Sequence, residues 1–215
     1  SVPSSGPLSS RPVPRGTTEY DVVVIGGGVN GVGVARDAAM RGLSVALFER
    51  NDLAFGASGN SSGMIHGGPR YLSYDPAVTE TSCRDSGHIQ HIAPHLLFRI
   101  PFLVPVLRSP QAKVMLTLMD AFFQAYDEYQ PLKHGKPHAR LTPEELAELE
   151  PGLHGDIVGG LSFDEWGIDG ARLATANALD ARERGATIML GTTVEHIERR
   201  EDTGEVVAVR WRDLR

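Results

Sequence analysis

The first fifty positions alternate between short unbroken apolar runs and a stretch with helical periodicity. Residues 20–25 (YDVVVI) form a β-branched run, which is typical of a strand buried on both faces. A glycine-rich turn follows, and then a helix is predicted over 32–42, with Gly42 at a position that suits its end. A second buried strand is predicted over 43–49 (LSVALFE). Strand, glycine turn, helix and strand within about 30 residues indicate a βαβ unit.

Beyond this unit the chain alternates loops with further predicted helices and strands. The stretch 51–75, rich in Gly, Ser and Asn, predicts a functional loop, because structureless segments of this length are uncommon inside compact domains. Helices are predicted over 76–92 and over 112–129. A further helix is predicted to begin at a capping box formed by Thr142, Pro143 and Glu145. Another is predicted over 170–184, with Asp169 as its capping residue. Strands are predicted within 157–169 and over 186–190, 193–200 and 206–212. Residues 96–107, which two prolines interrupt, are predicted to form an edge strand or an extended stretch. Residues 131–140 are predicted to form a loop.

The composition is that of an ordinary folded protein. The 215 residues are 41% hydrophobic and carry a formal net charge of −6, so no basic field attracts nucleic acid. A single cysteine, Cys83, excludes an internal disulfide and a Cys-rich metal site and is consistent with a reducing compartment. No apolar run reaches the roughly 18 residues of a membrane-spanning helix. The Ser- and Pro-rich residues 1–19 are predicted to form a disordered arm.

Two patterns suggest a metal or a membrane contact, and each has a simpler interpretation. The spacing of His88, His91 and His95 would suit metal ligands. However, Pro94 breaks the helical register and no carboxylate stands at a matching spacing, so no metal site is predicted. The helix over 112–126 carries an apolar stripe that a membrane surface could take, although such a stripe more often faces a core. The stripe consists of Met115, Leu116, Leu118, Met119, Phe122 and Phe123.

Three glycines after the first predicted strand form the pattern G-x-G-x-x-G. The pattern alone is weak, but here a strand precedes it, a helix follows, and Glu49 ends a second strand about 20 residues later, which is the full context of a dinucleotide site. Gly26 allows a tight turn, Gly28 lets the backbone approach a pyrophosphate, and Gly31 lets the helix pack on the strand. The helix N-terminus would face the diphosphate, and Glu49 would accept hydrogen bonds from the adenosine ribose. A glycine-rich turn without a ligand is the alternative.

Residues 20–72, YDVVVIGGGVNGVGVARDAAMRGLSVALFERNDLAFGASGNSSGMIHGGPRYL, closely resemble the opening of FAD-dependent glycerol-3-phosphate dehydrogenases within the D-amino-acid-oxidase-like flavoprotein superfamily. The Asn30–Gly31 pair, the loop S-x-x-S-S-x-x-I-H-G-G-x-R-Y-L, APHL at 93–96 and the segment 168–188 carry the similarity. The resemblance implies an α/β fold. It would combine a Rossmann-like FAD-binding βαβ domain of the glutathione-reductase type with part of a mixed-sheet substrate domain.

The resemblance also implies FAD as the cofactor and assigns residues to it. Ser58, Ser61, Ser62, Met64, His66 and Gly67 match the stretch that lies against the isoalloxazine ring; Gly26, Gly28, Asn30, Gly31, Glu49 and Arg50 match the nucleotide site; and Val194 matches a backbone contact to adenine. Arg70 and Tyr71 match positions that bind substrate, and the planar fork of an arginine suits a phosphate. His66 could be a general base, but its place beside the flavin favours an electrostatic role, with the base elsewhere in the fold.

The reaction implied by the resemblance is oxidation of sn-glycerol 3-phosphate to dihydroxyacetone phosphate by hydride transfer to flavin N5. Electrons would pass to a quinone or to electron-transfer subunits, and Gly63, where the aerobic form often has a lysine, is closer to the anaerobic catalytic subunit. We expect a cytoplasmic protein, with peripheral membrane association and a homo-oligomer both left open. The alternatives are an oxidase or dehydrogenase of an amino acid or a 2-hydroxy acid, and a non-catalytic nucleotide-binding module.

The same comparison suggests a domain division. Residues 20–75 and 165–215 are expected to form an incomplete FAD-binding domain, and 76–164 part of a substrate-binding domain. Family members are considerably longer, and no segment resembles the part that completes their FAD domain. We therefore interpret the chain as an N-terminal fragment that is inactive by itself.

Overall fold

A computed structural model of the protein describes residues 18–215, which form two compact units. The first unit combines the chain up to Ser62 with Asp169–Arg215, and the second unit is Gly63–Ile168. The predicted arm over 1–19 lies outside the described residues, apart from its last two positions.

The boundary between the units differs from the sequence-based division at 75 and 165. The short strand β3 (Met64–Ile65) pairs with β6 (Ile157–Ile168), so the loop that follows β3 belongs to the second unit. The end of β6 also lies in the second unit, because β6 pairs with β4 (Leu97–Leu107) as far as its last residue. Strand pairing between distant segments therefore determines where the chain crosses between units.

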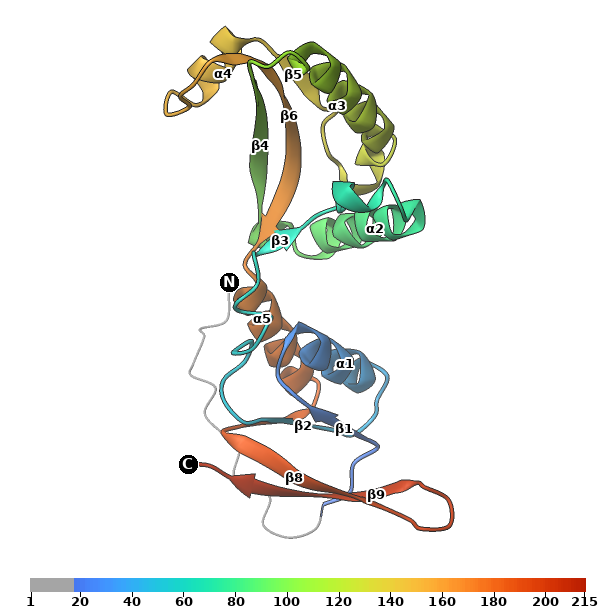
Figure 1. Cartoon of the computed structure of the whole chain (residues 1–215). Helices are drawn as coiled ribbons and strands as arrows, with labels where there is room; N and C mark the ends of the chain where they lie inside the picture. The colour runs from blue at the N-terminus through green and yellow to red at the C-terminus, as the bar shows by residue number, and fades with distance from the viewer. Residues whose placement is uncertain (1–17) are drawn as a thin grey trace. The chain divides into compact units, whose positions relative to one another are not determined.

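The first unit has a three-stranded parallel sheet in the order β1-β2-β7, with helices on one face and a hairpin on the other (Figure 1). Its elements are β1 (Val22–Ile25), α1 (Val29–Met40), β2 (Val45–Glu49), α5 (Gly170–Glu183), β7 (Thr187–Leu190), β8 (Thr192–Arg199) and β9 (Val206–Asp213). The predicted βαβ unit and the α/β fold class are confirmed.

Strand β2 is buried on both faces, which explains its unbroken apolar run. Side chains of a strand alternate between faces, so Val45 and Leu47 pack with α1 and α5. Ala46 and Phe48 point the other way and pack against the hairpin β8–β9. There the rings of Phe48 and Trp211 lie with centroids 5.7 Å apart. The hairpin thus closes the face that the helices leave open.

Strand β1 is less buried than its sequence predicts. Val23 is 38% exposed and Ile25 is 55% exposed. The reason is that β1 pairs only with β2 among the described strands, and a hollow of about 890 Å³ lies beside it, lined by β1 and β9. The prediction of a strand buried on both faces is therefore wrong for this element.

The second unit is built on β6, which lies at the centre of an antiparallel sheet. Strand β4 pairs along one edge of β6, while β3 and β5 (Ala139–Leu141) pair along the other. The helical elements are η1 (Pro69–Tyr71), α2 (Pro76–Ile92), η2 (Pro94–Leu96), α3 (Ala112–Asp127), η3 (Gln130–Lys133) and α4 (Pro143–Leu149). Figure 1 shows α2 and α3 on the same side of β6.

Several local predictions are confirmed in this unit, and one changes. Thr142 and Glu145 form the predicted capping box of α4. The two prolines of β4 are tolerated because its outer edge has no partner strand among the described residues. The predicted loop over 131–140 instead contributes most of η3 and the start of β5.

The apolar stripe of α3 divides between core and surface. Leu116 and Phe123 are 5% and 8% exposed and belong to core clusters, so the simpler interpretation holds for them. Met115 and Leu118 are exposed. Within residues 18–215, no helix has the length and apolar character needed to cross a membrane.

Candidate functional site

The glycine turn lies between the end of β1 and the start of α1. Gly26 has a φ of +108°, a conformation that side chains rarely adopt, and its N–H donates to the Phe48 carbonyl at 2.8 Å. A Cβ on Gly31 would lie 2.0 Å from the carbonyl oxygen of Gly26. The tight turn and the close approach of helix to strand therefore both require glycine, as the motif predicts.

The carboxylate of Glu49 lies against this turn. Its Oε2 accepts a hydrogen bond from the Gly27 N–H at 2.7 Å, and its Oε1 accepts one from the Asn51 N–H at 2.7 Å. A carboxylate has about four acceptor positions, so two remain for hydroxyl donors such as those of a ribose. The end of β2 thus presents an acceptor beside the backbone turn.

Ser58 covers the N-terminus of α1. Its Oγ accepts a hydrogen bond from the Val29 N–H at 3.0 Å, and a Cβ on Gly28 would lie 3.0 Å from the same oxygen. The first turn of α1 contains no acidic residue, so no carboxylate competes for its N–H groups. N–H groups at a helix start, a turn without side chains and a nearby acceptor fit the diphosphate and ribose of FAD.

The other predicted residues of the first unit are placed less tightly. Asn30 lies exposed in the first turn of α1, Arg50 is exposed directly after β2, and Ser61 and Ser62 are exposed at the end of the first segment. Val194 is half-buried on β8 opposite Trp211. The structure therefore brings together Gly26, Gly28, Gly31, Glu49 and Ser58. It leaves Asn30, Arg50, Ser61 and Ser62 exposed and Val194 half-buried against the hairpin.

The second unit holds the predicted residues of segment 64–71. His66 accepts the Gly68 N–H on its Nδ1 at 2.9 Å. In the neutral ring the proton must then lie on Nε2, which becomes a donor. Arg70 Nη2 donates to the Tyr71 hydroxyl at 2.8 Å, and the Arg70 guanidinium carbon lies 4.8 Å from the centre of the Tyr71 ring. The Arg70 side chain is otherwise exposed.

A buried polar cluster beneath this segment was not foreseen. It consists of Lys133, Glu165 and Tyr126, which come from η3, β6 and α3. Lys133 stands in a polar stretch that resembles a loop, and Glu165 in an alternating strand, so no local pattern indicated that the two would pair. Only the fold places them together.

A histidine between two carboxylates also lies outside the predicted site. His138 contacts Asp127 through Nδ1 at 2.7 Å and Asp120 through Nε2 at 3.1 Å. Burial lowers the pKa of His138, but Asp127 and Asp120, which accept hydrogen bonds from the protonated ring, outweigh it and raise the pKa overall. Across residues 18–215, no group of three or more His, Cys, Asp and Glu side chains is arranged to hold a metal ion.

Comparison with known proteins identifies the family. The family model described as FAD dependent oxidoreductase matches residues 21–213. Glycerol-3-phosphate dehydrogenase 1 of Mycobacterium tuberculosis (strain ATCC 25618 / H37Rv) is 41% identical over 198 residues, which cover 84% of this chain and 38% of the relative. D-erythritol 1-phosphate dehydrogenase of Brucella abortus (strain 2308) is 37% identical over 194 residues, which cover 90% of this chain and 38% of the relative.

A solved structure has the same fold. The glycerol-3-phosphate dehydrogenase of Bacillus halodurans complexed with FAD superimposes with a TM-score of 0.63 at 28% identity, over 91% of this chain and 31% of that chain. The chain thus spans less than two fifths of the length of each of these relatives. From the glycine turn, the acceptor at the end of β2 and the match along nearly the whole chain, we conclude that this chain belongs to the FAD-dependent oxidoreductase family.

Proposed function

We propose that the full-length protein oxidises sn-glycerol 3-phosphate to dihydroxyacetone phosphate, and that the electrons pass to a quinone or to electron-transfer subunits. The observation that carries the proposal is the FAD-type turn, with Gly26 and Glu49 in place, in a chain that aligns with a mycobacterial glycerol-3-phosphate dehydrogenase. Bound FAD would supply the hydride-accepting chemistry. This chain's backbone and side chains would bind the cofactor and the substrate.

In this proposal the N–H groups at the start of α1 bind the diphosphate. The Val29 N–H now donates to Ser58 Oγ at 3.0 Å, and a phosphate oxygen can replace that acceptor with a charged one. Glu49, Asn30 and Arg50 complete the nucleotide site, together with Gly28 and the backbone of Val194. Ser61, Ser62, Met64 and Gly67 would contribute to holding the flavin ring.

We assign His66 a donor role rather than that of the base. Because Nδ1 already accepts the Gly68 N–H, the neutral imidazole offers an N–H at Nε2. A preorganised donor of this kind stabilises negative charge that develops during hydride transfer. The proton of the substrate hydroxyl would then go to a base other than His66.

Arg70 and Tyr71 are proposed to bind the substrate phosphate. The Arg70 guanidinium donates one N–H to the Tyr71 hydroxyl, and its other N–H groups can donate to phosphate oxygens. The contact of the cation with the Tyr71 ring restricts where the guanidinium can point. A guanidinium held in this way suits a carboxylate as well as a phosphate, so the preference for a phosphorylated substrate rests on the similarity to glycerol-3-phosphate dehydrogenases.

The proposal is tested by the visible spectrum of the full-length protein under anaerobic conditions. Addition of glycerol 3-phosphate should bleach the flavin band, while D-amino acids and 2-hydroxyglutarate should leave it unchanged. Bleaching by those compounds and not by glycerol 3-phosphate would show that the substrate is an amino or hydroxy acid. A colourless protein that takes up no added FAD would indicate a non-catalytic module. Peroxide formed in air would identify oxygen, rather than a quinone, as the acceptor.

A matched pair of variants tests the phosphate contact. Arg70→Ala should raise KM for glycerol 3-phosphate about tenfold or more, the loss expected for a charge-assisted hydrogen bond. Arg84→Ala removes another exposed arginine of the same unit, which pairs with Glu80 on α2, and should leave KM unchanged. Equal KM values for the two variants would remove Arg70 from the proposal.

A second candidate is oxidation of a longer polyol phosphate. The similarity to the Brucella protein named D-erythritol 1-phosphate dehydrogenase favours it. The same anaerobic spectra with D-erythritol 1-phosphate decide between the two substrates. We further propose a cytoplasmic location, with peripheral association at the membrane surface as the way in which a quinone acceptor would be reached. Whether it assembles as a homo-oligomer is measurable by light scattering.

A further inference from the structure

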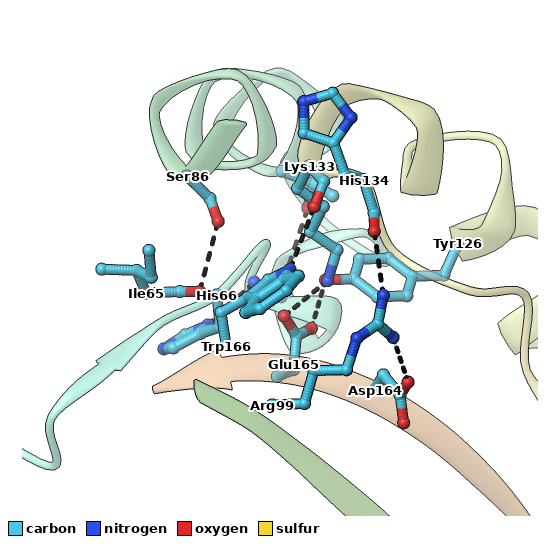
Figure 2. A network of polar contacts seen from close by, with 12 residues as sticks. Ile65, His66, Ser86, Arg99, Tyr126, Lys133, His134, Asp164, Glu165 and Trp166 are labelled. Carbon is cyan, nitrogen blue, oxygen red and sulfur yellow. Dashed lines mark hydrogen bonds and ion pairs between the residues drawn. The ribbon is translucent and has the colours of Figure 1, made fainter. Parts of the chain in front are cut away.

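The second unit buries an ion pair between Lys133 and Glu165. Lys133 Nζ lies 2.5 Å from Glu165 Oε2, and the two side chains are 0% and 1% exposed (Figure 2). Removing charges from water is costly, and their mutual attraction offsets this cost only when the geometry is good and further hydrogen bonds complete it.

Tyr126 supplies those further hydrogen bonds. Its hydroxyl donates to Glu165 Oε1 at 2.6 Å and accepts from Lys133 Nζ at 3.1 Å. Burial, followed by the negative charge of Glu165, raises the pKa of Tyr126 far above its ordinary value, so the hydroxyl keeps its proton. We call Lys133, Glu165 and Tyr126 the buried triad.

The buried triad lies directly beneath Gly67. A Cβ on Gly67 would lie 2.3 Å from the Tyr126 hydroxyl oxygen and 2.3 Å from the Cys83 sulfur. The backbone at Gly67 therefore rests on the hydroxyl that both charges hold in place. A change in the position of Tyr126 moves the support of this segment.

Neighbouring backbone groups are held from α2. Ser86 Oγ donates to the Ile65 carbonyl at 3.3 Å, and Thr79 Oγ1 to the Gly68 carbonyl at 3.5 Å. Figure 2 shows Ser86 above Ile65, with His66 on the same segment. From β6, Trp166 Nε1 donates to the Lys133 carbonyl at 3.0 Å, which ties η3 to β6.

Stability alone is a weak reason for such an arrangement. Replacing a buried ion pair by apolar residues of similar volume is often neutral or stabilising, whereas removing one partner is strongly destabilising. The triad is also enclosed, since the side chains of Lys133 and Glu165 are 0% and 1% exposed, so a ligand has no access to it. Apolar residues in place of the triad would not hold the Tyr126 hydroxyl by hydrogen bonds in one position beneath Gly67.

We propose that the buried triad is a positioning group that holds the backbone of His66–Gly68 in place, and through it the imidazole of His66. The Gly68 N–H can donate to His66 Nδ1 only while this backbone keeps its shape. The role of His66 in the reaction rests on the proposed function, whereas the support of the segment by the triad does not.

The decisive variant is the triple replacement Lys133→Met, Glu165→Leu and Tyr126→Phe in the full-length protein. It removes every polar atom of the triad at once, so no buried charge is left unpaired and the protein should stay folded. Leu146→Ala is the control, because Leu146 is buried in α4 of the same unit but is not part of the triad. Its cavity lowers stability without touching the support of Gly67.

Hydrogen exchange of the peptide covering residues 64–68 gives a readout that needs neither FAD nor substrate. The triple variant should exchange this segment about tenfold faster, a factor near the net contribution of one hydrogen bond. The control should exchange it as the wild type does. Wild-type exchange in a folded triple variant would overturn the proposal, and so would equally faster exchange in both variants. If the triple variant does not fold, Tyr126→Phe alone is measured against the same criterion.

A second readout separates this proposal from the proposed function. If the wild type reduces its flavin with glycerol 3-phosphate, the triple variant should lose kcat with little change in KM and show a shifted flavin spectrum. If the wild type does not respond to glycerol 3-phosphate, the substrate assignment fails while the exchange result still decides the role of the triad. Faster exchange with an unchanged kcat and spectrum would show that the triad does not position His66, and would overturn the proposal in that respect.

Discussion

Gly31 offers a test of the nucleotide-binding turn, because Gly33 provides a control on the same helix. A Cβ on Gly31 would lie 2.0 Å from the Gly26 oxygen and 3.1 Å from its carbonyl carbon, while a Cβ on Gly33 would meet nothing within 4 Å. Neither glycine has a positive φ, so the two positions differ only in space. Both are interior to α1.

The expected magnitudes follow from these distances. Alanine is favoured over glycine inside a helix by about 1 kcal/mol, so Gly33→Ala should stabilise the protein by up to that amount. Gly31→Ala gains the same propensity but forces α1 away from the end of β1 by roughly 1 Å. Overpacking of this kind costs about 1–3 kcal/mol or more. Because both variants gain the same propensity, their free energies of unfolding should differ by the overpacking cost alone, about 1–3 kcal/mol or more.

Urea unfolding and FAD titration of the full-length protein measure the difference. Gly31→Ala should lower the unfolding midpoint and weaken FAD binding, because the helix start moves away from the turn. Gly33→Ala should match or exceed the wild type in stability and bind FAD equally well. If Gly31→Ala unfolds and binds FAD as Gly33→Ala does, the turn does not hold the geometry described above, and the reasoning from it is refuted.

Three further predictions concern single side chains. Thr142→Ala removes one half of the capping box and should cost about 1 kcal/mol in urea unfolding; no loss would show that the box does not contribute. His138 has a raised pKa from Asp127 and Asp120, so the stability it contributes is fully present below about pH 6.5 and is lost as pH rises through its folded pKa. His138→Gln should remove that pH dependence, and an unchanged profile would contradict it. Glu49→Ala should weaken FAD binding by about tenfold or more, since two N–H groups lose their acceptor as well; unchanged binding would exclude a ribose contact.

Much of the first unit could be predicted from short stretches of sequence. The glycine spacing, the apolar runs and the residues that cap α1 and α5 are local signals that act over a few positions. The run 45–48 is apolar throughout because both faces of β2 are covered. The same inference was wrong for β1, whose neighbours across the sheet are not encoded in the strand itself.

The site divides in the same way. The amino-acid sequence by itself determined the turn at Gly26, the family and the cofactor, because each depends on residue types at a fixed spacing. Only the tertiary structure decided that Glu49 bonds to Gly27, that Ser58 covers the start of α1, and that Lys133 pairs with Glu165 beneath Gly67. These contacts join residues from separate elements, so strand register and helix packing create them, and neither is written in any one segment of the chain.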